Sequence, residues 1–166
     1  MPARSAVFID PKRLSVTHLA HFVGVFANQQ VLEKMTRAGF GDLRESHGYL
    51  IQHLLRGPHS VGQLSKLLGV SQQAVSKTVA ELKRAGYLEI QSGSDARVRL
   101  VTLSVRGHQA VQASRRMRAR LERRLLQSLG PRRAAAARVA LLHLLQDLGA
   151  TEAVTSRRVP NADAQA

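Results

Sequence analysis

The sequence contains no cysteine among its 166 residues, which excludes disulfide bonds, zinc sites built on thiolates and sensing by thiol oxidation. Tryptophan is absent and aromatic residues make up 4% of the chain, so the stacking surfaces typical of single-strand nucleic-acid binding are scarce. No apolar run reaches the length that a bilayer requires, and residues 1–13 lack the apolar core of a signal peptide. We therefore expect a cytoplasmic protein.

Acidic residues are also few. Asp and Glu number 11 against 25 Lys and Arg, which leaves a formal net charge of +14. This surplus favours a polyanionic partner and a salt-sensitive interaction with DNA, although RNA, the ribosome or an anionic membrane surface would also suit it. The length suffices for one domain, or for a small domain with an oligomerisation element, and a second, enzymatic domain is not expected.

Residues Ser60–Gly86 carry two helix starts separated by a turn that contains glycine. Ser60 and Gln63 have the spacing of a capping box, in which each side chain bonds a backbone group of the other residue. Leucines then recur on one helical face until Gly69, which can leave the helix with a positive φ. Ser71 can cap a second helix, whose apolar stripe is Val75, Val79 and Leu82. The pattern predicts a helix-turn-helix.

The face of the second helix opposite this stripe is small, polar and cationic. Glutamine can pair with adenine, serine is adaptable, and lysine favours guanine acceptors or phosphate. The first two turns of a recognition helix are the part that usually enters the major groove. We therefore expect Gln73, Ser76 and Lys77 to contact bases, and Ser71 and Gln72 to contact phosphate together with nearby backbone amides. The alternative is an ordinary solvated helix face.

Two segments with strand patterns follow this helix pair. Tyr87–Gln91 alternates polar and apolar residues, and Arg97–Leu103 is rich in branched and apolar residues. The turn-rich residues 92–95 lie between them, so the pattern predicts a β-hairpin with a charged tip. A helix-turn-helix followed by such a hairpin is a winged helix.

Over about residues 43–107 the winged helix resembles the MarR family of bacterial transcription regulators. The most specific part is Asp95-Ala96-Arg97 followed by Leu103-Ser104 and Gly107. This segment is similar to the family's D-x-R wing signature leading into L-[ST]-x-x-G. The other matching residues are Leu64, Leu68, Gly69, Val70, Ser71, Val75, Leu82, Gly86 and Val101.

The resemblance implies roles for the two charged residues of the wing. In such proteins the arginine, here Arg97, reaches toward the minor groove, and the aspartate, here Asp95, helps to hold it. A narrow minor groove concentrates negative potential and attracts a guanidinium, whereas the alternative is a solvated hairpin arginine. The sequence departs from the family at Ile90 and Gln72, where arginine is frequent, so phosphate contacts are expected to be fewer or redistributed.

Helical patterns flank the winged helix on both sides. Apolar residues repeat at helical steps over about residues 13–38 and 43–56 before it. After it, patterns run over residues 104–129 and 131–148, and these helices are too apolar to stand in water alone. A C2 homodimer would cover them, and would place two recognition helices one turn of DNA apart on a pseudo-palindromic operator.

The expected fold is mainly α with a small β-hairpin wing: a winged helix-turn-helix plus a helical dimerisation layer.

The basic segment Arg115–Arg124 is expected to be a solvated helix face, with a second nucleic-acid patch as the alternative. Both ends of the chain lack periodicity. The expected divisions are a flexible arm (1–11), an N-terminal dimerisation helix (12–38), the winged helix-turn-helix (39–103), C-terminal dimerisation helices (104–149) and a flexible tail (150–166).

Four histidines are candidate ligands. His18 and His21 are three residues apart, but no complementary cluster of metal ligands is apparent, so an ordinary interface or half-buried role is favoured over a metal site. His47 and His53 flank the helix that borders a small-molecule cavity in proteins of this kind. Contact with a ligand is one hypothesis for these two residues, and partial packing at the edge of the core is the alternative.

The expected function is sequence-specific binding of double-stranded DNA by a dimeric transcription regulator, in particular a repressor that occludes a promoter. By resemblance, a small anionic or aromatic effector would favour a separation of the recognition helices that no longer fits DNA. The alternative is a non-specific or architectural DNA-binding protein. No motif indicates a cofactor, a membrane partner or an enzyme, since phosphate loops, metal clusters and nucleophile groupings are missing.

Overall fold

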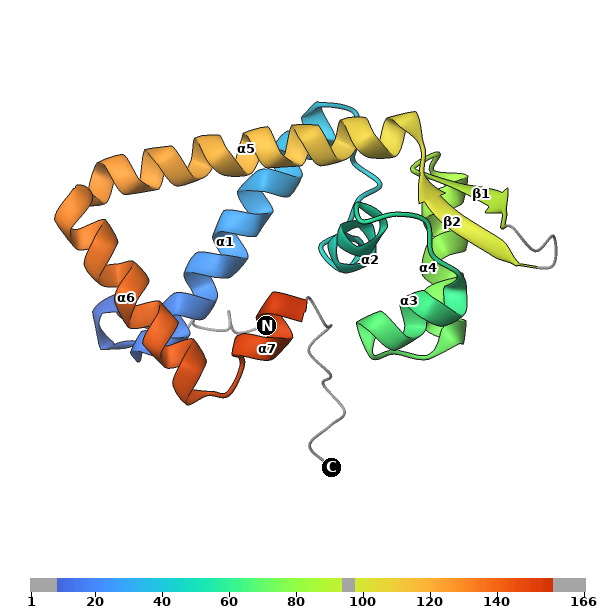
Figure 1. The fold of residues 1–166 in the computed structure, drawn as a ribbon. Coiled ribbons are helices and arrows are strands. Elements are labelled where there is room, and N and C mark those ends of the chain that lie inside the picture. Colours follow the sequence, from blue (N-terminus) through green and yellow to red (C-terminus); the bar gives the residue numbers. More distant parts are fainter. Residues whose placement is uncertain (1–8, 94–97, 157–166) are drawn as a thin grey trace, which may run out of the picture.

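The computed structural model describes residues 9–93 and 98–156 and is mainly helical (Figure 1). Two strands form one antiparallel hairpin between the fourth and fifth α-helices. The elements are η1 (Pro11–Arg13), α1 (Val16–Arg37), α2 (His47–Leu54), α3 (Val61–Leu68), α4 (Gln72–Arg84), β1 (Leu88–Ser92), β2 (Arg99–Leu103), α5 (Val105–Leu129), α6 (Pro131–Asp147) and α7 (Thr151–Ser156). The mainly α fold with a β-hairpin is thus confirmed.

The helix-turn-helix forms where its caps predict it. The Ser60 hydroxyl accepts a hydrogen bond from Gln63 N at 3.2 Å, and the Gln63 side chain accepts one from Ser60 N at 2.8 Å. Gly69 ends α3 with φ +70°, a conformation that costs glycine little because it has no Cβ. The Ser71 hydroxyl then accepts from Ala74 N at 3.2 Å and starts α4. Both helices therefore begin at residues that satisfy otherwise unpaired backbone amides.

The hairpin pairs Leu88 with Leu103 at one end and Ser92 with Arg99 at the other. On the opposite edge of β2, His59 exchanges two backbone hydrogen bonds with Val101, at 3.1 and 2.8 Å. These bonds fix His59, the residue before the N-cap of α3, to the wing. The hairpin and the helix-turn-helix consequently form one packed unit.

Apolar side chains from α2, α3, α4 and both strands make a continuous core beneath this unit. Full burial of such a side chain contributes about 1.5–3 kcal/mol relative to exposure. Tyr87, which follows the left-handed Gly86, is completely buried. The core residues of the winged helix are Leu50, Ile51, Leu54, Leu64, Leu68, Val75, Val79, Leu82, Tyr87, Leu88, Val101 and Leu103.

The start of α5 is tied to the end of α4 at several points. Ser104 N donates to Tyr87 O at 3.0 Å, and the Ser104 hydroxyl donates to Gly86 O at 2.6 Å while it accepts from Gly107 N at 3.0 Å. Arg106 donates to Gly39 O at 2.7 Å and lies over the rings of Phe40 and Tyr87. Helix α5 therefore leaves the wing in a fixed direction.

Helices α1, α5 and α6 extend beyond the winged helix (Figure 1). Met35 and Val31 of α1 pack with Val111 and Leu121 of α5 in the core. No residue of α6 is buried, although the structure describes all of that helix. The exposed large apolar side chains of these helices are Val16, Leu19, Phe22, Val23, Val25, Phe26, Val105, Leu125, Leu126, Leu129, Val139, Leu141 and Leu142.

Two sequence-based boundaries are wrong. Helix α2 begins at His47 instead of about residue 43, because residues 43 and 44 are irregular, residues 45 and 46 form a turn, and Arg44, Glu45 and Ser46 are exposed. Residues 151–156, expected to lack regular structure, form α7, whose amide of Val154 donates to Ala150 O at 3.0 Å. None of the helices described is both long and apolar enough to cross a membrane.

Candidate nucleic-acid interface and pocket

The side chains proposed to contact DNA lie together at the start of α4. Ser71, Gln72, Gln73, Ser76 and Lys77 are all exposed. On the other side of the helix, its apolar stripe is at most 4% exposed and packs into the core. The burial pattern of α4 therefore presents the polar residues of its first two turns outward as one surface.

The start of α4 lies beside the start of α3. A Cβ placed on Gly62 would meet the Gln72 side-chain nitrogen at 3.7 Å and the Ser60 hydroxyl oxygen at 3.9 Å. Gln72 thus lies across the first turn of α3. Because the amino end of a helix carries partial positive charge and unpaired amides, this arrangement favours an anion such as phosphate near Gln72.

The two wing residues expected to contact DNA, Asp95 and Arg97, lie outside the described residues. Directly before them, Gly93 N donates to Val98 O at 2.7 Å, so the backbone pairing continues beyond the last paired strand residues.

A charged cluster connects the segment before α2 to α4. Arg44 donates to the Glu81 carboxylate at 2.8 Å, and His47 Nε2 lies 3.7 Å from the same carboxylate oxygen. The backbone amide of Arg44 donates to His47 Nδ1 at 3.2 Å. Burial is the main cause that lowers the pKa of His47; the Arg44 charge lowers it further and Glu81 opposes the shift. Neutral His47, with its proton on Nε2, fits this arrangement.

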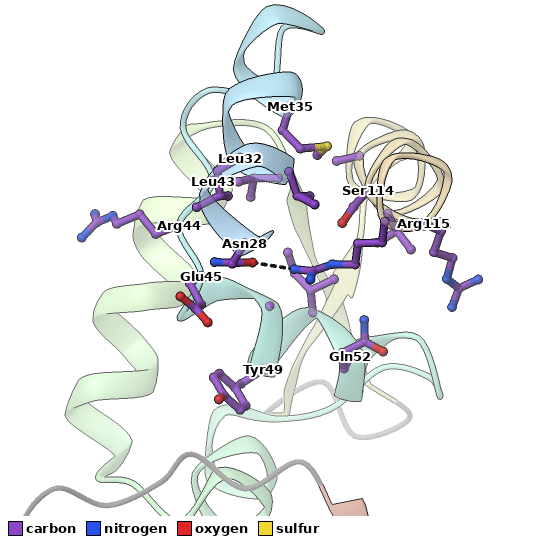
Figure 2. Close-up of a pocket in the computed structure, with 16 residues that line it drawn as sticks. Asn28, Leu32, Met35, Leu43, Arg44, Glu45, Tyr49, Gln52, Ser114 and Arg115 are labelled. Atoms are coloured by element: carbon purple, nitrogen blue, oxygen red, sulfur yellow. Dashed lines mark hydrogen bonds between the residues drawn. The ribbon is translucent and has the colours of Figure 1, made fainter. Parts of the chain in front are cut away.

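A cavity of about 520 Å³ lies between α1, α2 and α5, a size common for small-molecule sites (Figure 2). Its walls combine apolar side chains from all three helices with polar groups. The lining residues are Asn28, Val31, Leu32, Met35, Leu43, Arg44, Glu45, Gly48, Tyr49, Ile51, Gln52, Ala110, Val111, Ser114, Arg115 and Arg118.

His47 and His53, the two histidines considered as ligand contacts, do not line this cavity. Each is 4% exposed and belongs to the interior face of α2. Their burial on the same side of α2 as Leu50 and Leu54 agrees with the alternative of packing at the edge of the core, and contact with a ligand stays a prediction.

One polar contact inside the cavity was not foreseen from the sequence. Arg118 of α5 donates to the side-chain oxygen of Asn28 on α1 at 2.8 Å, and Figure 2 shows this contact between the two helices. Asn28 is 8% exposed. The amide is a neutral partner and leaves the charge of the guanidinium uncompensated. Ninety positions separate the two residues, so no local spacing could have indicated the pair.

Within the ranges 9–93 and 98–156, the side chains of His, Asp and Glu form no group of three or more that could hold a metal ion.

Comparisons with known proteins place these features in a family. Residues 42–98 match the model of the MarR family, and no curated protein sequence matches the chain. The structure is similar to MepR, a transcription regulator of the Staphylococcus aureus multidrug efflux pump MepA, with a TM-score of 0.66 and 17% identity over 81% of this chain and 99% of that chain.

Two further solved structures show the same fold. A MepR mutant from S. aureus bound to an oligodeoxyribonucleotide has a TM-score of 0.60 and 17% identity, over 82% of this chain and 99% of that one. Wild-type MarR from E. coli, in its apo form, has a TM-score of 0.58 and 18% identity, over 80% of this chain and 98% of that one. The matched residues contain the helix-turn-helix, so residues 42–98 are similar to the MarR family, and over 80–82% of its length the chain has the winged-helix fold of these solved structures.

Proposed function

We propose that the protein is a transcription regulator that binds double-stranded DNA in a sequence-specific manner and represses by occluding a promoter. The observation that carries the proposal is the exposed polar surface at the start of α4, set on a buried apolar stripe. Gln73, Ser76 and Lys77 read base edges in the major groove. Ser71 and Gln72 contact phosphate at the two neighbouring helix starts. Arg97 reaches into the flanking minor groove, and Asp95 helps to hold Arg97.

A homodimer is the functional unit of this proposal. Phe22 and Phe26 of α1 are 42% and 58% exposed, and Leu142 of α6 is 51% exposed. Large apolar surfaces of this kind are rarely left in water by a soluble protein, and a second copy would cover them. Two copies related by a two-fold axis would present two α4 helices to the half-sites of a palindrome.

The cavity between α1, α2 and α5 is the proposed effector site. Arg118 supplies a positive charge beside apolar walls, which suits a small anion with an apolar or aromatic body. An effector that binds more tightly when the spacing of the two reading helices does not fit DNA would release the DNA. Arg118→Gln should lower affinity for such an anion while operator binding without effector is retained.

The alternative is an architectural protein that binds all duplexes nearly equally through its positive charge. The distribution of polar groups on α4 favours sequence reading, because glutamine and serine add hydrogen-bonding capacity without adding charge.

Selection of bound sequences from a random duplex pool, at near-physiological salt and with the full chain, tests the proposal. A palindromic consensus with half-sites about 10–10.5 base pairs apart, or a multiple of that distance, is the expected result. Absence of enrichment, with binding that fades steeply as salt rises, would instead support the architectural alternative.

A further inference from the structure

The positive charge of the chain is concentrated outside the winged helix. Residues 105–129, which form α5, contain seven arginines and one glutamate, a net charge of +6 out of the total of +14. Residues 61–104, from α3 through the wing, contain six Lys or Arg and three Asp or Glu, a net charge of +3. Arg106 and Arg118 of α5 have the contacts described above, and the reading of an operator by α4 leaves most of the other five arginines of this helix without a role.

Three of these arginines form a stripe along the outside of α5. Arg116, Arg120 and Arg123 follow steps of four and three residues, which places them on one helical face. The buried positions Ala110, Val111 and Leu121 belong to the opposite side of the helix. All three arginines are exposed, and among the residues that the structure describes none of them has a carboxylate partner.

The stripe lies on the side of α5 away from the buried positions that pack into the core. Figure 1 shows α5 along the upper edge of the molecule, crossed by the turn that follows α1, with α2, the helix-turn-helix and most of α1 below it. A duplex held by the start of α4 would therefore not lie along the outer face of α5. The stripe is available to another partner while the first surface is occupied.

The side chains beside the arginines indicate the chemistry of that partner. Gln109, Gln112 and Gln127 continue the stripe at both ends, and all three are exposed. Interfaces with proteins have apolar or aromatic centres, and helices that lie on membranes bury an apolar face. The stripe has neither, whereas arginine and glutamine together suit a row of phosphates.

We infer that the outer face of α5, through Arg116, Arg120 and Arg123, is a second binding surface for duplex DNA that does not depend on sequence and lies apart from the apolar faces of α1 and α6 proposed for the dimer. Each guanidinium neutralises a backbone phosphate and releases a counterion. A protein with a reading surface on α4 and this stripe on α5 holds two duplex segments at once, and so bridges an operator to other DNA.

The first test measures affinity for a random-sequence duplex over a range of salt concentrations, with the full chain. The stripe variant carries Arg116→Gln, Arg120→Gln and Arg123→Gln. The matched control carries Lys34→Gln, Arg37→Gln and Arg132→Gln, which removes the same charge from exposed positions elsewhere. The slope of log affinity against log salt should fall by about 2.7 per protomer in the stripe variant, about 0.9 for each lost phosphate contact, and by less in the control. Equal slopes for the two variants would overturn the inference.

The second test measures bridging. An immobilised duplex saturated with wild-type protein should capture a labelled random duplex, and capture should be lost with the stripe variant and kept with the control. No capture by the wild type would overturn the inference. The inference would also be overturned if the stripe variant lost binding to polyglutamate while its binding to DNA stayed unchanged. That result would assign the face to an acidic protein partner.

Far-ultraviolet circular dichroism checks that both variants fold. The salt test needs no operator. Failure of the sequence selection would therefore contradict the proposed function and leave this inference to be judged by its own results.

Discussion

At Gly107, a hydrogen atom is the largest side chain that the packing admits. A Cβ at this position would overlap the Tyr87 carbonyl oxygen and lie 3.2 Å from a methyl group of Leu103. The glycine of the L-[ST]-x-x-G motif is thus explained by the close approach of α5 to the backbone that enters the wing. Gly107→Ala should lower the free energy of unfolding by about 1–3 kcal/mol through overpacking, measured by urea denaturation.

Gly24→Ala is the matched control for this substitution. Gly24 lies inside α1, and a Cβ there would meet nothing within 4 Å. Alanine should therefore stabilise the helix by up to about 1 kcal/mol. Equal effects of the two substitutions would contradict the packing explanation.

His47 makes the stability of the protein depend on pH. Burial keeps the pKa of His47 in the folded protein below the usual 6.5, so the unfolded chain takes up a proton at higher pH than the folded chain does. Stability should be unaffected by this group well above 6.5 and should fall as the pH drops from there toward the lower folded pKa. The uptake of one proton changes the free energy of unfolding by at most about 1.4 kcal/mol per pH unit.

His47→Asn should reduce this dependence, because the asparagine oxygen can accept the Arg44 amide without taking up a proton. Denaturation midpoints measured from neutral to mildly acidic pH would show the difference. The exposed His143→Asn is the control and should leave the wild-type profile in place. An identical acid profile in wild type and His47→Asn would rule out His47 as the cause.

The contacts of single side chains are the part of the structure that the sequence predicts least completely. The exposure of Gln73, Ser76 and Lys77 follows from the spacing of the buried stripe on α4, and the structure has it so. Arg118 and Asn28 could not be paired, because their contact depends on how α1 crosses α5. For His47 and His53 the sequence leaves ligand contact and packing at the core edge both open, and the rotation of α2 about its axis buries both side chains.

At the scale of elements, Ser104 joins the end of one element to the start of the next. Its hydroxyl caps α5 through Gly107 N and also donates to Gly86 O. Ser104→Ala removes both bonds and should cost about 2 kcal/mol of unfolding free energy, since a cap and a buried hydrogen bond each contribute about 1 kcal/mol. Thermal or urea unfolding provides the measurement.

Ser104→Thr retains a hydroxyl and should recover most of that loss. Ser71→Ala removes the cap of α4 alone and should cost about 1 kcal/mol. A cost for Ser104→Ala no greater than that for Ser71→Ala would contradict the double role of Ser104.

Helices and strands with strong local signals were predictable. Capping residues predict the starts of α3, α4 and α5. Alternating residues predict β1, and branched and apolar residues predict β2. The start of α2 was misplaced because Leu43 extends the apolar pattern into a segment that turns. Helix α7 was missed because six residues are too few to show a helical period.

At the scale of the whole molecule, the exposed apolar faces of α1 and α6 predict the oligomeric state. Wild-type protein should sediment at about twice the mass of one 18.2 kDa chain. Phe22→Asp or Leu142→Asp should shift the population toward the monomer, because a charge would be buried without a partner in the interface. Analytical ultracentrifugation gives the masses.

Val105→Asp is the control for these two substitutions. Val105 is 74% exposed at the first turn of α5, away from the proposed interface, and an acidic residue there suits the helix dipole. This variant should remain a dimer. A wild-type monomer, or dissociation by all three substitutions, would contradict the assignment of the interface.

The central claim is that the first two turns of α4 read the sequence of DNA, and it is tested most directly by comparing the sequences that wild type and Gln73→Ala select from one random pool. The variant should lose preference at one position in each half-site, symmetrically about the centre, with the remaining consensus intact and a loss of about 1–3 kcal/mol in binding free energy on the wild-type site. An unchanged consensus from a folded Gln73→Ala protein would contradict base reading by Gln73. Absence of any consensus from the wild type would contradict the claim itself.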